Sequence, residues 1–195
     1  MRDIVFATGN PGKRREMENL LAPIGLSLRL PSEFGVFSPP EETGDTFLEN
    51  ARIKAAAAIA HTGEISLADD SGLVVDALGG APGVQSARWG GTGLSPDKRN
   101  ALLVREMDGV STPNRSARFV CVLVCLFPDG REIVAEGTCE GEIMREARGC
   151  GGFGYDPLFY LPRLGKTMAE LTKEEKNLVS HRGQAAREFI RRWRV

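Results

Sequence analysis

The sequence has few of the residues that structural metal sites and disulfide frameworks require. It contains four cysteines and two histidines in 195 residues, and no two cysteines are spaced as Cys-x-x-Cys. Structural zinc sites are built from closely spaced cysteine and histidine ligands, and a chain of this length does not need disulfides to fold. We therefore expect a cytoplasmic protein without structural zinc, in which the thiols are reduced and buried. The cysteines are Cys121, Cys125, Cys139 and Cys150.

The sequence also lacks a charge excess of one sign and any long apolar run. Lys and Arg total 25 and Asp and Glu total 26, so the net charge is −1. Proteins that coat duplex DNA depend on a large positive charge, so nucleic acid is not the expected partner. The longest apolar run, residues 119–127, is strand-sized and far below the roughly 18 residues of a membrane span. The length predicts one domain, residues 1–195, organised as one body or as two joined lobes.

A strand, a glycine-containing turn and a helix open the chain. Apolar residues 4–7 predict a buried strand, and Asn10 and Pro11 fit the N-cap and the first position of the following helix. Backbone N–H groups at such a helix N-terminus bind anions. The cations at residues 13–15 oppose the helix dipole, at a cost of about 0.3–1 kcal/mol each. A bound phosphate would turn this cost into a gain, and solvated surface cations are the alternative.

Two pairs of acidic residues interrupt the pattern further along. Residues 65–68 predict a strand, residues 69–72 (Asp-Asp-Ser-Gly) a tight turn, and residues 73–75 a continuing strand. A turn alone accounts for only one of the two aspartates. A magnesium site, which uses one or two carboxylates together with phosphate oxygens, is the other candidate explanation. Glu41 and Glu42 precede the second predicted helix and can supply another ligand. Because neighbouring side chains of an extended chain point in opposite directions, we expect one member of each pair to face the site.

A second glycine-rich loop spans residues 149–154 and formally reads G-x-G-x-x-G. A dinucleotide-binding fingerprint has to open a helix, but this loop leads into a predicted strand at residues 158–160. Phe153 stands between glycines, either as a core anchor or as a platform for stacking a base. Lys176 and residues 181–182 (His-Arg) gather side chains that suit carbonyl or phosphate oxygens, and a solvated loop is the alternative.

The remaining elements predict the fold class. Thr46 and Glu49 resemble a capping box for an alanine-rich helix, and residues 95–97 open another helix. Residues 128–130 (Pro-Asp-Gly) between two apolar runs indicate a hairpin. Early alternation of strands and helices followed by a hairpin predicts an α/β chain with a mixed sheet, and the glycine-rich residues 79–95 are a candidate lobe boundary.

Six segments carry a family resemblance. They are ATGNPGK (7–13), EETGDTFLENARIKA (41–55), ADDSGLVVDALGGAPG (68–83), SARW (86–89), GGFGYDPLF (151–159) and KNLVSHRGQA (176–185). In this order they resemble the Ham1/RdgB family of inosine triphosphate pyrophosphatases. The resemblance covers nearly the whole chain and departs at Gln85, where the family usually has Tyr; this affects local packing but none of the roles below.

The resemblance implies both a fold and a reaction. The implied fold is α/β, an elongated mixed β-sheet flanked by helices, with two lobes and a central nucleotide cleft. The implied reaction converts ITP, dITP and XTP to the monophosphate and pyrophosphate, which removes deaminated purines from the nucleotide pool. Mg²⁺ is the implied cofactor, purine nucleoside triphosphates are the implied partners together with a second copy of the chain in a homodimer, and no nucleic acid or membrane is expected.

The resemblance also implies roles for individual residues. Phosphate contacts are expected from Thr8, Asn10, Lys13 and Lys54, and further substrate contacts from Gly9, Pro11, Gly12 and Ser71. Mg²⁺ is expected at Glu42 and Asp70, and Asp70 is also expected to take the proton of the attacking water. Phe153 would stack on the base beside Gly154, Tyr155 and Asp156, and Lys176, His181 and Arg182 would read the base edge. Asp69 would either support the metal or orient Asp70.

Two other functions compete with this one. A Maf-type pyrophosphatase has a similar fold but acts on other nucleotides, and the segments 153–156 and 176–182 favour the Ham1 side. A nucleotide-binding regulator without hydrolysis is a different class. The acidic residues Glu42, Asp69 and Asp70 argue against it, because binding alone needs no activator of water.

Overall fold

The computed structural model describes residues 2–193. Its strands are β1 (Arg2–Phe6), β2 (Leu26–Arg29), β3 (Ser66–Val75), β4 (Ser116–Leu126), β5 (Glu132–Ile143), β6 (Phe159–Leu161) and β7 (Lys166–Thr167). They form one seven-stranded sheet in the order β2-β1-β3-β4-β5-β6-β7. β1 is parallel to β2 and β3, whereas β6 is antiparallel to β5 and β7. The sheet is therefore mixed, as the sequence predicts.

Capping residues place the helices where the sequence expects them. The α-helices are α1 (Pro11–Leu21), α2 (Phe47–Thr62), α3 (Pro96–Glu106), α4 (Lys173–Val179) and α5 (His181–Arg192). Asn10 caps α1, and Thr46 with Glu49 forms the capping box of α2.

The first helix was expected to run to Gly25, but α1 ends at Leu21, and a 3₁₀ turn, Ala22–Ile24, follows. Pro23 explains the change, because proline has no N–H to donate and clashes with the preceding turn.

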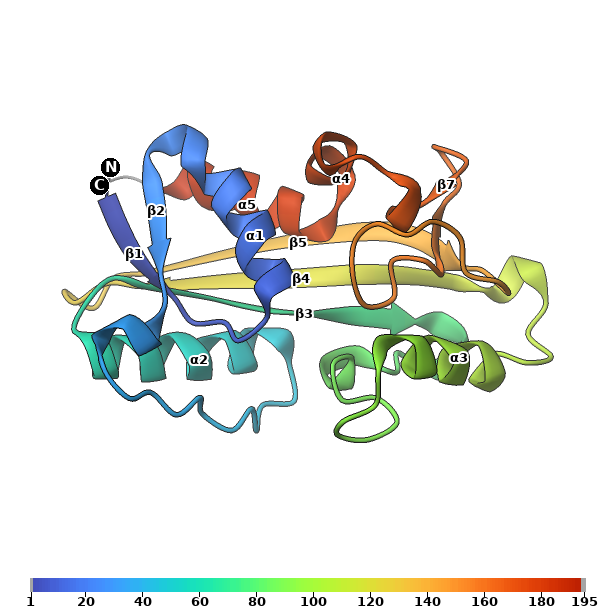
Figure 1. Ribbon diagram of the computed structural model, residues 1–195, viewed down its shortest axis with the longest axis horizontal. Helices are drawn as coiled ribbons and strands as arrows, with labels where there is room; N and C mark the ends of the chain where they lie inside the picture. Colours follow the sequence, from blue (N-terminus) through green and yellow to red (C-terminus); the bar gives the residue numbers. More distant parts are fainter. Residues whose placement is uncertain (1, 194–195) are drawn as a thin grey trace. The chain divides into compact units, whose positions relative to one another are not determined.

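The first of two compact units contains β1, β2, α1 and α2. It comprises residues 2–70, 121–137 and 181–193. Within it, α1 and α5 pack together on one face of the strands and α2 lies on the other (Figure 1). Its core includes Ile4, Phe6, Met17, Leu21, Leu67, Leu123 and Phe189. Gly137 lets α5 approach β5, because a Cβ there would collide with the backbone of His181 and Ala185.

The second unit comprises residues 71–120 and 138–180. Its core includes Leu73, Leu103, Met107, Phe119, Tyr155, Phe159 and Met168. Arg115 is 3% exposed and donates to the backbone oxygens of Met107 at 3.0 Å and Ile143 at 2.7 Å. It thereby ties the end of α3 to the end of β5. Gln85 is exposed, so the departure from the family's tyrosine leaves the core of this unit intact.

The tight turn predicted at residues 69–72 does not form. β3 passes through these residues without interruption. Local preference disfavours aspartate and glycine in a strand, but Asp69 and Asp70 are both buried and paired with cations of neighbouring helices. Tertiary contacts therefore outweigh local preference here. The candidate lobe boundary at residues 79–95 is also wrong, because this segment lies wholly within the second unit and the division falls inside β3, β4 and β5.

Two other features bear on the expectations from composition. All four cysteines are free, but Cys150 is exposed, whereas Cys121, Cys125 and Cys139 are buried as expected. Burial raises the pKa of the Cys121 thiol to about 12. Among residues 2–193, no helix combines the length and the apolar composition that crossing a membrane would require.

Candidate active site

Side-chain hydrogen bonds shape the loop between β1 and α1. The hydroxyl of Thr8 accepts from the Asn10 backbone N–H at 3.2 Å. The side-chain oxygen of Asn10 accepts from the N–H groups of Gly12 at 2.8 Å and Lys13 at 3.2 Å. A Cβ added to Gly9 would meet nothing within 4 Å, so the space beside this residue is open. The loop is a preformed helix N-terminus with room for an anion.

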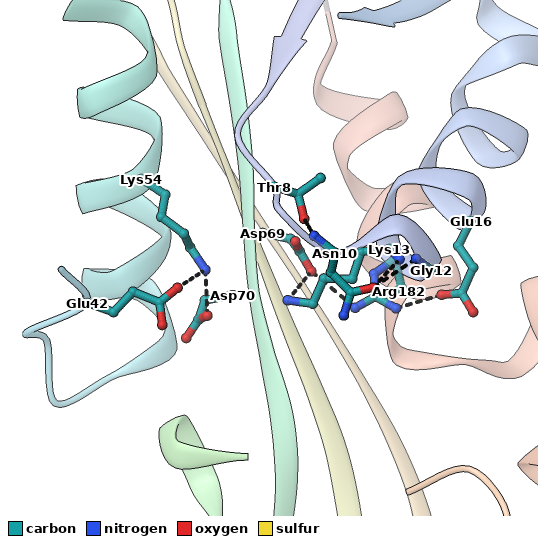
Figure 2. Close-up of polar contacts among 10 residues, drawn as sticks. All are labelled: Thr8, Asn10, Gly12, Lys13, Glu16, Glu42, Lys54, Asp69, Asp70 and Arg182. Atoms are coloured by element: carbon teal, nitrogen blue, oxygen red, sulfur yellow. Dashed lines mark hydrogen bonds and ion pairs between the residues drawn. The ribbon is translucent and has the colours of Figure 1, made fainter. Parts of the chain in front are cut away.

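Lys13 extends from this helix start to a buried carboxylate. Its Nζ lies 3.0 Å from Oδ2 of Asp69, which is 1% exposed. The same oxygen pairs at 3.1 Å with Nη2 of Arg182, whose Nη1 lies 2.6 Å from Glu16 (Figure 2). We call Lys13, Asp69, Arg182 and Glu16 the four-residue ion network. Lys13 therefore has an ion-pair partner within the chain. The sequence had suggested either a bound phosphate or a solvated surface cation, and neither of these explanations included such a partner.

The cations of the network keep Asp69 ionised. Burial disfavours the charged form of this carboxyl, but the positive charges of Lys13 and Arg182 outweigh it and hold the pKa of Asp69 well below its usual range. A buried carboxylate with two cationic partners is a stable anion over the working pH range of most proteins. Asp69 is thus fitted to hold Lys13 and Arg182 in place.

Asp70 points to the opposite side of β3 and meets a different charge. Lys54 of α2 places its Nζ 2.7 Å from Oδ1 of Asp70 and 2.9 Å from Oε1 of Glu42 (Figure 2). We call Glu42, Lys54 and Asp70 the lysine-bridged pair. The opposed directions of Asp69 and Asp70, and the choice of Glu42 over the exposed Glu41, agree with the alternation expected from the sequence.

Burial dominates the electrostatics of Asp70. It is 6% exposed, and burial raises the pKa of its carboxyl although the charge of Lys54 acts against this. Burial also opposes the charge on Lys54, but Asp69 and Asp70 together raise the pKa of its ammonium group. Oδ2 of Asp70 is buried and has no hydrogen-bond partner among the described residues. An acceptor left in this state points to a missing donor, water or cation.

The chain offers only a partial set of metal ligands. Among residues 2–193, no group of three or more His, Cys, Asp or Glu side chains is arranged to hold a metal ion. Glu42 and Asp70 are two carboxylates converging on one cation, the ammonium of Lys54. Mg²⁺ is commonly held by one or two carboxylates together with substrate phosphates and water. The lysine-bridged pair and the unpartnered oxygen of Asp70 therefore fit a cation that arrives with a phosphate.

In the second unit, Asp156 organises the other group of predicted site residues. Its carboxylate is 3% exposed. Oδ2 accepts from the backbone N–H of Phe153 at 2.8 Å and from Nζ of Lys176 at 2.6 Å. The same Nζ lies 4.9 Å from the centre of the Phe153 ring, within cation–π range. Gly152 has φ +71°, and a Cβ there would collide with this carboxylate, so the turn requires glycine.

The side chains of the 153–156 segment face different surroundings. Phe153 is half-buried and is absent from the described core of this unit, which favours a platform over a core anchor. Tyr155 is 4% exposed, and its hydroxyl donates to the backbone oxygen of Ser86 at 3.0 Å. The backbone oxygen of Gly154 accepts from the Asn100 side chain at 3.1 Å. The buried Tyr155 therefore anchors the segment. The backbone of residues 153–156 and the side chain of Phe153 are the parts that are left to form the predicted wall beside a base.

The predicted site residues are distributed over both units. Residues 8–13, Glu42, Lys54, Asp70, His181 and Arg182 belong to the first unit, and Ser71, residues 153–156 and Lys176 belong to the second. Arg182 forms ion pairs with Glu16 and Asp69 of the network, whereas the resemblance places Arg182 at the base edge. Sequence reasoning missed Glu16 and Asn100. The spacing of Lys13 and Glu16 on one helix face was an available signal, but no local pattern marked Asn100.

The fold and these clusters define a class: α/β proteins in which an open, capped helix N-terminus accompanies a buried acidic centre. The Ham1 family model matches residues 4–192, and the chain belongs to this family. A dITP/XTP pyrophosphatase from Desulforamulus reducens is 51% identical over 187 residues, covering 96% of this chain and 93% of that protein. A dITP/XTP pyrophosphatase from Thermus thermophilus is 52% identical, covering 96% and 89%. The structure of a Ham1 protein from Coxiella burnetii is 43% identical, with a TM-score of 0.88, covering 97% of this chain and 96% of that one.

Proposed function

We propose that this protein hydrolyses ITP, dITP and XTP to the nucleoside monophosphate and pyrophosphate. The observation that carries the proposal is the buried Asp70, which has one oxygen without a partner beside Lys54 and Glu42. Burying such a carboxylate without full hydrogen bonding lowers the stability of the folded protein. A regulator that only binds nucleotides would not need a carboxylate in this state. The relatives named dITP/XTP pyrophosphatase support the substrate class.

The reaction joins water to the α-phosphorus and breaks the bond to the bridging oxygen of the β-phosphate. Asp70 takes the proton of the attacking water, a step that a carboxyl with a raised pKa favours. Negative charge then develops on the bridging oxygen and on the pyrophosphate. Lys13, Lys54 and the α1 N-terminus stabilise this charge. Glu42 and Asp70 would hold Mg²⁺, which supplies Lewis-acid stabilisation of phosphate oxygens when bound.

The resemblance assigns a further set of residues to the base. Phe153 stacks on the purine, and Lys176 and Asp156 hold the ring of Phe153 and its backbone in place. We assign His181, Arg182 and Lys176 to the 6-keto edge. Hydrogen-bond donors at this place pair with the 6-keto oxygen of hypoxanthine and xanthine, whereas the 6-amino group of adenine would set one donor against another. Ser71 contributes a further substrate contact.

Pyrophosphate release tests the proposal directly. The purified protein is incubated with ITP, dITP, XTP, GTP or ATP, with Mg²⁺ or with a chelator, and pyrophosphate and orthophosphate are measured separately. Rapid, Mg²⁺-dependent release of pyrophosphate from ITP and XTP, and slow release from ATP, is the expected result. Binding without release would identify a regulator, and release of orthophosphate alone would place the cleavage at the γ-phosphorus. The homodimer and the cytoplasmic location stay predictions, the first of which sedimentation can test.

A further inference from the structure

Lys54 occupies oxygens that the proposed metal site would need. Its Nζ lies 2.7 Å from Oδ1 of Asp70 and 2.9 Å from Oε1 of Glu42. All three side chains are largely shielded, with 13% of Lys54, 22% of Glu42 and 8% of Asp70 exposed. In such surroundings an ammonium group and a divalent cation on the same two carboxylates repel each other with little screening by water.

Asp70 carries an oxygen that would gain from a further positive charge. Its Oδ1 pairs with the ammonium group of Lys54, which also contacts Glu42, and its Oδ2 is buried with no hydrogen-bond partner among the described residues. Oδ2 of Asp69, one residue away, instead faces two cations, Lys13 and Arg182. A buried acceptor in the state of Asp70 Oδ2 points to a donor or a cation that arrives with a ligand.

We propose that Lys54 is an internal counter-ion that occupies the carboxylates of Glu42 and Asp70 until the triphosphate arrives. The inference rests on the proposed function. A phosphate gives the ammonium group an alternative partner, and the flexible stem of lysine lets it change partners. The carboxylates are then released for the divalent cation. Lys54 thus makes the binding of metal and the binding of triphosphate depend on each other.

This exchange predicts weak metal binding by the free protein. The apparent affinity of a site falls by the fraction of molecules in which the site is open. If Lys54 keeps the carboxylates occupied in at least nine molecules of ten, removing its charge strengthens the binding of Mg²⁺ alone by about tenfold or more. The same variant loses the phosphate contact, so it binds nucleotide less tightly while binding Mg²⁺ more tightly. A merely structural lysine would not produce these opposite shifts.

Calorimetric titration of the nucleotide-free protein with Mg²⁺ at pH 8 tests this. Lys54→Met removes the charge and keeps an apolar stem, and Lys54→Gln is the second variant if the first does not fold. Lys54→Arg keeps the cation, and Lys166→Met is the matched control, since Lys166 pairs at 3.0 Å with Glu175 on the surface. Adding Asp70→Asn to Lys54→Met locates the site. Pyrophosphate release from ITP by the wild type is measured in parallel.

We expect Lys54→Met to bind Mg²⁺ at least about tenfold more tightly than the wild type, and Lys54→Arg and Lys166→Met to match the wild type. Addition of Asp70→Asn should abolish the gain. Equal or weaker Mg²⁺ binding by Lys54→Met and Lys54→Gln, while the wild type releases pyrophosphate from ITP, would overturn the counter-ion role and leave the proposed function standing. A wild type that releases no pyrophosphate from any nucleotide would overturn both.

Discussion

Asp69 and Asp70 are adjacent on β3 and similarly buried, with exposed fractions of 1% and 6%, but they face different helices. Asp69 meets Lys13 and Arg182 from α1 and α5, and its pKa lies well below the usual range despite burial. Asp70 shares Lys54 of α2 with Glu42, and burial raises its pKa. The cations that face each aspartate, more than its burial, separate a fixed structural anion from a group poised to bind a proton or a metal.

The largest effect should follow from neutralising Asp70. Asp70→Asn removes the base and a metal ligand while keeping the shape, so kcat for ITP should fall by about 10²–10⁴-fold. Thermal stability should change little, because Lys54 keeps Glu42 as a partner. Steady-state kinetics at saturating Mg²⁺ and a thermal unfolding curve check both. Near-normal turnover by the folded variant would remove Asp70 from the mechanism.

Neutralising Asp69 should chiefly reduce stability. Asp69→Asn leaves Lys13 and the buried Arg182 without their shared carboxylate, and breaking a buried ion pair from one side costs about 3 kcal/mol or more. Urea unfolding measures this loss, with Asp70→Asn as the matched control one residue away. If the two variants lose equal stability, the distinction between the two aspartates is wrong.

The two aspartates should also give opposite responses to acid. The folded pKa of Asp69 lies below its unfolded value of about 3.9. Its stabilisation is therefore present above about pH 4 and is lost as the pH falls toward the folded pKa. The folded pKa of Asp70 is raised, so protonation of Asp70 relieves destabilisation as the pH falls.

The free energies of unfolding of the wild type, Asp69→Asn and Asp70→Asn, measured between about pH 6 and pH 3, test these two opposite responses. Carboxyl groups with ordinary pKa values, near about 4, titrate within this range. Asp69→Asn should lose less stability on acidification than the wild type, and Asp70→Asn should lose more. Parallel curves for all three proteins would contradict the assignment of both pKa shifts.

Sequence reasoning succeeded where local chemistry decides the structure and failed where distant charges do. The Asn10 cap, the Thr46 capping box and the hairpin at residues 128–130 follow from neighbouring residues alone. The turn expected at residues 69–72 follows from the same local rules, yet β3 continues through these residues because Lys13, Lys54 and Arg182 from three helices pair with its aspartates. No local pattern reveals which helices will flank a strand.

Arg182 belongs to the four-residue ion network and is also proposed to contact the base edge. Replacing Arg182 should change the selectivity between ITP and ATP by a smaller factor than replacing Asp70 changes turnover. A site built around one hydrogen-bonding group can discriminate by roughly 10⁴–10⁵, and one donor supplies part of that. Arg182→Ala should lower kcat/KM for ITP more than for ATP and so reduce their ratio. An equal loss on both substrates would assign Arg182 to the four-residue ion network alone, holding Asp69 and Glu16.

Lys13 should give the smallest change, and its partner in the free protein decides how to interpret it. Lys13 is paired with Asp69, so removing it affects the fold as well as the ligand. Lys13→Ala should raise KM for ITP by more than the roughly twofold change, about 0.5 kcal/mol, that an ordinary surface substitution produces. The control is Arg15→Ala, an exposed cation of the same helical turn. If Lys13→Ala loses stability but keeps the KM of the Arg15→Ala variant, then Lys13 serves only to neutralise Asp69. A raised KM at unchanged kcat would instead mean that the lysine binds the triphosphate equally in the ground state and the transition state.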